Sequence, residues 1–160
     1  MLRNPSRVHE AIKVCLQFGW KDSLPLLGHI VDRPSSLGAY RGAYQASREL
    51  AGKPIPAELL AAEKAIERRG FPSRGSTEGD LAAARRTIVE AADVEAATFV
   101  GISLATFTTK GNVAPVRMEG VEILRALPRA TVEKMLNRLA NGLQDDIQRD
   151  FVAKVLTQVL

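Results

Sequence analysis

The C-terminal segment carries the pattern that most narrows the folds open to this chain. Between residues 132 and 159, apolar side chains recur at intervals of three and four residues. That spacing places them on one face of an α-helix, whereas a half-buried strand would require alternation. Gly142 interrupts the pattern, so it either bends one helix or separates two. The side chains that we expect this segment to bury are Leu136, Leu139, Ile147, Phe151 and Val155.

The composition favours helices over the rest of the chain as well. Of 160 residues, 22 are Ala and 18 are Leu, both strong helix formers, and only 5% are aromatic. All-β proteins usually depend on Val, Ile, Thr and aromatic residues instead. An apolar fraction of 46% and this length are typical of one globular domain. We therefore expect a mainly α, compact domain over residues 1–160, with about 6–8 helices and a two-lobe split at residues 70–80 as an alternative.

Capping residues, prolines and glycines indicate where the other helices begin and end. Asn4 and Pro5 form a typical helix start, and Ser35 or Ser36 precedes another. Thr77 with Asp80 resembles a capping box ahead of a further helical stretch. The helices expected from these signals cover residues 5–18, 24–31, 36–50, 57–69, 81–97 and 121–127.

Residues 97–118 admit two interpretations. The stretch is rich in β-branched and aromatic residues and contains the turn sequence Lys110-Gly111-Asn112, which is typical of a β-hairpin. Continuation of the preceding helix is the alternative, because residues from 88 to 106 keep helical spacing. Pro115 cannot donate a backbone hydrogen bond, so it confines a second strand to a sheet edge. We favour the hairpin and retain the helix as the alternative.

The loop from Gly70 to Thr77 has the spacing of a phosphate-binding loop but lacks its chemistry. Ser76 stands where the lysine that contacts phosphate belongs, and a charged helical segment precedes the loop in place of a buried strand. The match is therefore accidental. The sequence contains no dinucleotide-binding, nucleophile-elbow or kinase motif.

Catalytic and metal-binding groups are few and poorly arranged. Cys15 lies on an apolar helical stripe six residues from His9, a spacing that turns the two side chains away from each other. His29, near Asp32, is expected to be satisfied locally. The carboxylates at 145, 146 and 150, and those at 63 and 67, are interspersed with basic residues and are expected on solvated helix faces. We predict no enzyme, no cofactor and no metal site.

The charge balance indicates which partners the chain could bind, and the number of cysteines indicates the cellular compartment. The net charge is +4 with a pI near 9.5, and the excess of Lys and Arg lies in residues 1–53 and 110–160. This balance permits an acidic partner, either nucleic acid or protein. A single cysteine excludes an intramolecular disulfide and favours a reducing compartment. Because we find neither an apolar run of about 18–20 residues nor a signal peptide, we expect a cytoplasmic protein without a membrane partner.

The helix expected at residues 36–50 has two contrasting faces. Arg41, Tyr44 and Arg48 share one face, and two guanidinium groups beside a ring form a platform for phosphates and a stacked base. The alternative is that the arginine stems cover Tyr44 as ordinary surface, or that another helix covers it. The opposite face is suited to close packing and consists of Ala39, Ala43, Ala46 and Leu50.

Lys110 and Arg117 flank the turn of the expected hairpin, where a projecting tip is able to touch nucleic acid. The leading hypothesis is a non-catalytic helical subunit that contacts nucleic acid within a larger assembly through these two residues and the Arg41–Tyr44–Arg48 face. The alternative is a protein–protein adaptor or a structural subunit, for example of a virus particle, with protein partners or further copies of itself. In size, basicity and helical character the chain is similar to the helical small subunits of CRISPR effector complexes, an analogy that no motif supports.

Overall fold

The structure is all-α. The computed structural model describes residues 5–71 and 77–160, and this part of the chain contains nine α-helices, two short 3-10 helices and no strand. The mainly α prediction is confirmed, whereas the count of 6–8 helices and the hairpin at 97–118 are wrong. The elements are α1 (Pro5–Gln17), η1 (Lys21–Ser23), α2 (Leu24–Asp32), α3 (Leu37–Leu50), α4 (Ala57–Glu67), η2 (Arg68–Gly70), α5 (Glu78–Val89), α6 (Val94–Ala105), α7 (Ala114–Ala126), α8 (Arg129–Gly142) and α9 (Asp146–Val159).

The chain divides into two compact units, each built from two separate stretches of sequence. Unit 1 comprises residues 1–55 and 138–152, and unit 2 comprises residues 56–137 and 153–160. The loop at 70–80 lies within unit 2, and the middle of its phosphate-loop match, residues 72–76, falls outside the described residues. The single domain over the whole chain stays a prediction.

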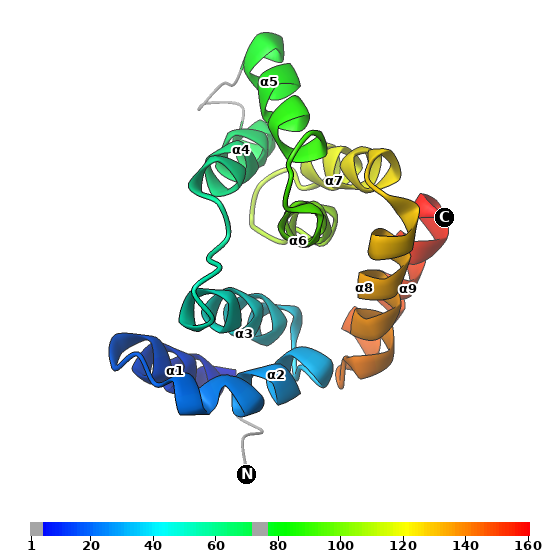
Figure 1. Ribbon diagram of the computed structural model, residues 1–160. Helices are drawn as coiled ribbons and strands as arrows, with labels where there is room; N and C mark the ends of the chain where they lie inside the picture. Colours follow the sequence, from blue (N-terminus) through cyan, green and yellow to red (C-terminus); the bar gives the residue numbers. More distant parts are fainter. Residues whose placement is uncertain (1–4, 72–76) are drawn as a thin grey trace. The chain divides into compact units, whose positions relative to one another are not determined.

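In unit 1, α3 packs against both α1 and α2 (Figure 1). Helix α1 meets α3 at two glycines, where a Cβ at Gly42 would lie 3.4 Å from Cδ1 of Ile12 and one at Gly38 would lie 3.5 Å from Nε2 of His9, both ordinary van der Waals contacts. The small side chains that were expected to pack are buried, and they are Ala39, Ala43, Ala46 and Leu50.

The connection between α8 and α9 docks on the residues that precede α3. The backbone N–H of Gln144 donates to the carbonyl of Pro34 at 3.0 Å. The N–H of Leu37, in the first turn of α3, donates to Oε1 of Gln148 at 2.7 Å. A helix start leaves such N–H groups without intrahelical partners, so a residue 111 positions away in the sequence satisfies one of them here.

The C-terminal periodicity is divided between two helices, as one alternative predicted. Gly142 ends α8, and a Cβ there would lie 3.0 Å from the carbonyl carbon of Asp32, so the backbone approach favours glycine. Leu136 and Leu139 on α8 are fully buried, as expected.

Part of the core expected from α9 is wrong. Ile147 is 82% exposed and Phe151 is half-buried, whereas Val152 and Val155 are buried. The break between α8 and α9 resets the helical register, because residues 143–145 are not helical and do not advance the chain by 100° each. Val155 is therefore the one expected side chain of α9 that reaches the core.

Helix α6 is the centre of unit 2, where it packs against α4, α5 and α7 (Figure 1). Nearly all of its residues are buried, including every residue from 96 to 102. A helix buried on all sides is apolar all round, so its sequence shows no face and its β-branched residues mimic a strand. The hydroxyl of Thr98 donates to the carbonyl of Val94 at 2.7 Å, which satisfies this buried polar group within the helix.

Two helix boundaries near α6 also differ from the expectation. The helix expected at 81–97 is interrupted, because the side chain of Asp93 accepts a hydrogen bond from the N–H of Ala96 at 3.0 Å and so begins α6 as a separate helix. Pro115 lies in the first turn of α7, a position that needs no N–H donor, and not in an edge strand. The short helix expected at 121–127 is thus the second half of α7.

Close contact between α6 and α7 depends on glycines. A Cβ at Gly120 on α7 would lie 2.7 Å from Cα of Ala105 on α6, so backbone meets backbone at this crossing. A Cβ at Gly101 on α6 would in turn lie 2.8 Å from Cδ2 of Leu124. At the other end of α7, the guanidinium of Arg125 donates to the carbonyl of Gln158 at 2.6 and 2.9 Å, which holds the last turn of α9 within unit 2.

Candidate nucleic-acid interface

Helix α3 carries the predicted Arg41–Tyr44–Arg48 face. Ser36 caps the helix, because its hydroxyl accepts a hydrogen bond from the N–H of Ala39 at 3.1 Å. From this start, Arg41, Tyr44 and Arg48 follow at helical spacing of three and four, and each side chain is partly exposed. The helix therefore brings these three residues to one face, on unit 1.

The same residues are also held by the protein. The ring of Tyr44 lies 6.0 Å from that of Tyr40, tilted by 37°, and Arg41, Tyr44 and Arg48 each take part in a further interaction within the chain. Burial raises the pKa of the Tyr40 hydroxyl above its ordinary value, and the neighbouring Tyr44 adds to that rise while Arg138 opposes it. Tyr40 is therefore neutral at physiological pH and serves as packing beneath Tyr44.

Lys110 and Arg117 lie on a helix–helix connection and not on a hairpin. Lys110 is exposed in the segment that joins α6 to α7. Arg117 is half-buried in the first turns of α7, and its Nε donates to the carbonyl of Phe107 at 2.8 Å, which closes this segment. Both residues belong to unit 2, so each unit carries one of the two predicted sets.

The N-terminal part of unit 1 exposes an aromatic pair that the sequence did not single out. The rings of Phe18 and Trp20 stack with centroids 5.5 Å apart and planes inclined by 26°. Phe18 is 62% exposed and Trp20 is 55% exposed. Val14 is exposed as well and lies one helical turn before Phe18, so the three side chains form one apolar surface, called here the Phe18–Trp20 surface.

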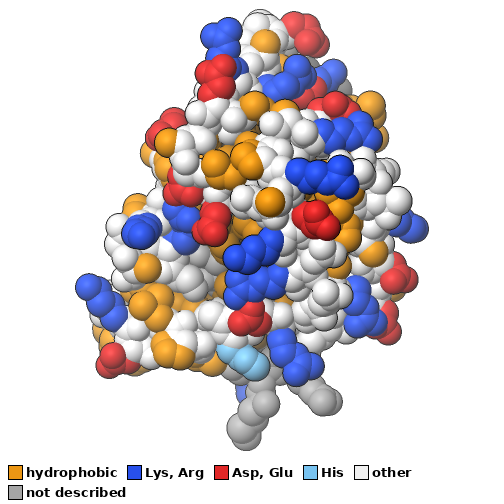
Figure 2. Space-filling model, turned by 45° about the vertical axis from the view of Figure 1, so that its right-hand side comes forward, with side chains coloured by type: hydrophobic (Ala, Val, Ile, Leu, Met, Phe, Trp, Pro, Cys, Tyr) orange, Lys and Arg blue, Asp and Glu red, His pale blue; other side chains and the backbone are white. Residues whose placement is uncertain are grey.

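Exposed polar and charged residues of both signs are near this surface in the sequence, and they are Glu10, Lys13, Gln17, Lys21 and Asp22. On the wider molecule, Lys and Arg side chains are interspersed with Asp and Glu on the face shown in Figure 2. Unit 1 carries 10 basic and 7 acidic side chains, and unit 2 carries 12 and 11, so the excess of positive charge lies mainly in unit 1.

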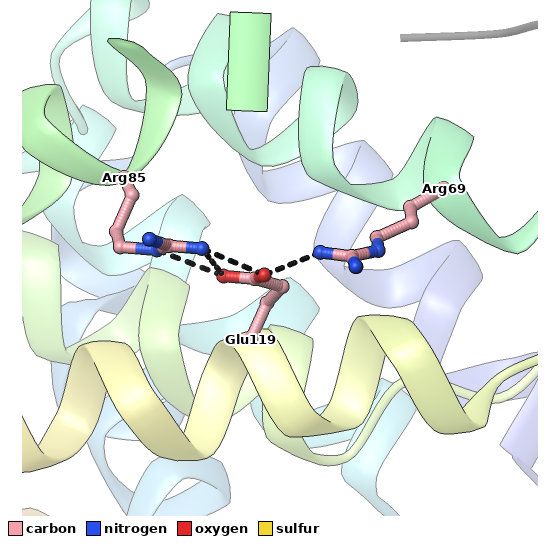
Figure 3. Close-up of polar contacts among 3 residues, drawn as sticks. All are labelled: Arg69, Arg85 and Glu119. Atoms are coloured by element: carbon pink, nitrogen blue, oxygen red, sulfur yellow. Dashed lines mark hydrogen bonds and ion pairs between the residues drawn. The ribbon is translucent and has the colours of Figure 1, made fainter. Parts of the chain in front are cut away.

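A cluster of three charged residues ties unit 2 together. Glu119 on α7 lies between Arg85 of α5 and Arg69 of η2, which point toward it from opposite sides (Figure 3). Arg85 donates to both carboxylate oxygens, at 2.8 to 3.0 Å, and Arg69 donates to Oε1 at 2.5 Å. The side chain of Glu119 is only 9% exposed, whereas those of Arg69 and Arg85 are 36% and 45% exposed.

This cluster has the chemistry of a structural tie. Two guanidinium groups bind the carboxylate of Glu119, so both of its oxygens are engaged by cations of the protein itself. The sequence did contain a signal for it, because Glu119 shares an apolar helical stripe with Val116, Gly120 and Ile123. A charge on such a stripe indicates burial with a partner.

The structure gives the positions of the groups weighed for catalysis. Cys15 is buried, as predicted, and His9 and His29 are exposed. Asp32 pairs with Arg138 rather than with His29. Among the residues that the structure describes, no three His, Cys, Asp or Glu side chains converge as metal ligands would.

The acidic residues expected on solvated faces divide into two cases. Asp145 and Asp146 are exposed at the start of α9, where Asp145 accepts a hydrogen bond from the N–H of Gln148 at 2.9 Å and Asp146 pairs with Arg149. Glu63 is buried, so the expected exposed position is wrong. It lies one turn after Leu59 on the inward face of α4.

Within the described ranges, no helix combines the length and the apolar character that crossing a bilayer requires. Comparison with protein-family models, with curated proteins and with solved structures finds no match to this chain.

Proposed function

We propose that this chain is a non-catalytic helical subunit that contacts nucleic acid within a larger assembly. The observation that carries the proposal is the face of α3, where Arg41, Tyr44 and Arg48 are partly exposed at helical spacing. Guanidinium groups bind phosphate oxygens, and a tyrosine ring adds a surface on which a base stacks. Since each of these residues also has a contact within the chain, nucleic acid would share these side chains with the protein.

The charge distribution supports only weak nucleic-acid binding by the isolated chain. The excess of three positive charges on unit 1 is small beside that of proteins that bind nucleic acid alone. Neighbouring subunits of the assembly would supply further phosphate contacts. The proposal includes a cytoplasmic location, because the single, buried Cys15 suits a reducing compartment.

The proposal is tested by the salt dependence of binding to a labelled single strand. Replacing Arg41 and Arg48 with Ala removes two phosphate contacts, so the slope of log K against log salt should fall by about 1.4, at ~0.7 per contact on a single strand. Fluorescence anisotropy of labelled RNA and DNA strands at several salt concentrations measures this slope, with helicity checked by circular dichroism.

The matched control replaces Arg33 and Lys53, two exposed basic residues of unit 1 outside this face, with Ala. It removes the same charge and should leave the slope nearly unchanged. Equal slopes for wild type and the Arg41→Ala/Arg48→Ala variant would exclude this face as the contact. If wild type binds no strand at all, the protein–protein adaptor becomes the better proposal.

A further inference from the structure

We infer that the Phe18–Trp20 surface is a stacking site for the unpaired bases of single-stranded nucleic acid. The inference rests on the proposed function and names the form of nucleic acid and a second contact on unit 1. The exposed stacked pair itself is the starting observation, since both rings are more than half exposed and aromatic side chains are enriched at binding interfaces.

The geometry of the pair suits bases. The ring planes of Phe18 and Trp20 are inclined by only 26°, so the two rings form a short stack of nearly parallel planes. A base that continues this stack covers an exposed aromatic face without a hydrogen-bond partner, which makes the contact tolerant of sequence. Duplex bases are already stacked on one another, so an unpaired strand has the exposed bases that this surface requires.

The surroundings suit a phosphate backbone better than a protein partner. The exposed charged side chains of α1 and η1 are three basic and two acidic, and two of the basic ones, Lys13 and Lys21, adjoin the apolar residues in sequence. The apolar surface itself consists of three side chains, Val14, Phe18 and Trp20. A stable protein interface usually needs about 20–30 residues a side with a larger apolar centre.

Trp20 is the only tryptophan in the chain, so its fluorescence reports on this surface alone. A single strand of roughly 12 nucleotides, within the site size of known single-strand binders, is titrated into the full chain, and a duplex of equal length is titrated separately. We expect the single strand to quench Trp20 emission in a saturable way and the duplex to quench it much less.

Substitutions separate stacking from folding and from charge. Phe18→Ala and Trp20→Ala should each weaken single-strand binding about tenfold, measured by anisotropy of a labelled strand, because each removes one stacking face. Trp20→Phe keeps a ring and should bind within about threefold of wild type. Met118→Ala, which truncates an equally exposed apolar side chain on unit 2, should bind like wild type.

The outcomes distinguish this inference from the proposed function. If wild type binds the strand but Trp20 emission is unchanged and Trp20→Ala binds equally well, the inference is wrong while the proposed function stands. The inference is equally wrong if Trp20→Phe binds as poorly as Trp20→Ala, because the ring would then not act by stacking. If wild type binds neither strand nor duplex, the proposed function fails, and the inference fails with it.

Discussion

Glu119 shows how one buried charge joins three elements. Its carboxylate accepts hydrogen bonds from Arg85 and Arg69, so α7, α5 and η2 meet at a single side chain. Burying a carboxylate is costly unless cations compensate it, and here two do so. Because both guanidinium groups remain partly exposed, water is able to hydrate them if the carboxylate is removed.

Glu119→Gln should lower the free energy of unfolding by about 2–3 kcal/mol, which is less than for a fully buried pair because of that hydration. The matched control is Glu122→Gln, which removes a carboxylate that pairs with Arg125 on the same helix but is 60% exposed. The control should cost less than about 1 kcal/mol. Urea unfolding followed by circular dichroism measures both, and equal losses would contradict a special role for Glu119.

The sequence predicted side-chain positions on α3 better than it predicted binding surfaces. The alanine face of α3 and the opposed Arg41–Tyr44–Arg48 face follow from helical spacing alone, and their burial agrees with it. Phe18 and Trp20 flank Gly19, where the helical spacing of apolar residues ends. The spacing therefore did not predict whether these two side chains are exposed or buried. Glu63 was placed on the surface because it alternates with basic residues, although its spacing from Leu59 and Ile66 put it on the buried stripe.

At the scale of the element, the stability of the capped start of α5 depends on pH. A hydrogen bond from the side chain of Thr77 lowers the pKa of Asp80 below its ordinary value, and one from the backbone of Thr77 lowers it further. The folded state therefore favours the ionised carboxylate, so this capping contribution is fully present above pH 3.8, the ordinary value. It is lost as the pH falls through the lowered pKa.

Thr77→Ala should raise the pKa of Asp80 towards its ordinary value, because the hydroxyl that donates to the carboxylate is gone. Titration of the Asp80 carboxyl carbon by NMR measures the shift. Thr87→Ala is the control, since it removes a hydroxyl of the same helix that donates to the carbonyl of Ala83 instead. An unchanged pKa in Thr77→Ala would show that the hydroxyl of Thr77 does not stabilise the ionised carboxylate, since the backbone N–H of residue 77 is still present in that variant.

The crossing of α6 and α7 leaves no room for a side chain at residue 120. Gly120→Ala places a Cβ against the backbone of Ala105, so the helices must separate, at a cost of about 1–3 kcal/mol. Gly28→Ala is the matched control in the interior of α2, because apart from its chain neighbours and the helix's own backbone nothing lies within 4 Å of a Cβ placed there. This control should gain about 0.4–1 kcal/mol from the helix propensity of Ala. Thermal unfolding followed by circular dichroism measures whether the midpoint falls in Gly120→Ala and rises in Gly28→Ala.

Elements with a polar face were predictable from the sequence, and the fully buried one was not. Helices α2 and α3 begin and end within a residue or two of the expected positions, because caps and a one-sided apolar stripe mark them. Helix α6 is apolar on all sides, so its sequence shows no one-sided apolar stripe. Only tertiary packing decides that residues 97–105 are helical. The cap at Asp93 was the one local sign of a new helix, and it was missed.

At the scale of the whole molecule, the C-terminal stretch serves both units. Residues 138–152 belong to unit 1 and residues 153–160 to unit 2. In unit 1 this stretch supplies Gln144 and Gln148, which bond to the residues around the start of α3. In unit 2 it supplies the carbonyl of Gln158, which accepts from Arg125.

Two truncations therefore have separable effects. Removal of residues 153–160 takes away the carbonyl of Gln158 that accepts from Arg125, so it should reduce hydrogen-exchange protection at the end of α7. Gln144 and Gln148 remain in this shortened chain, so the start of α3 should stay protected. Removal of residues 138–160 should also reduce protection at the start of α3. Hydrogen exchange read by mass spectrometry compares the two shortened chains with the full chain. Loss of protection in α3 after the shorter truncation would contradict this division.

The bond from Leu37 to Gln148 also has a consequence for the order of events during synthesis. A ribosome delivers the chain from its N-terminus at about 5–20 residues per second, so α3 emerges several seconds before residue 148 exists. Helices α4 to α7 follow one another in sequence and pack on near neighbours, so they are able to associate as they emerge. The segment that is translated first is thus completed late. In a nascent chain stalled after α7, the N–H of Leu37 would still lack its partner Gln148, whereas α4 to α7 would already be largely assembled.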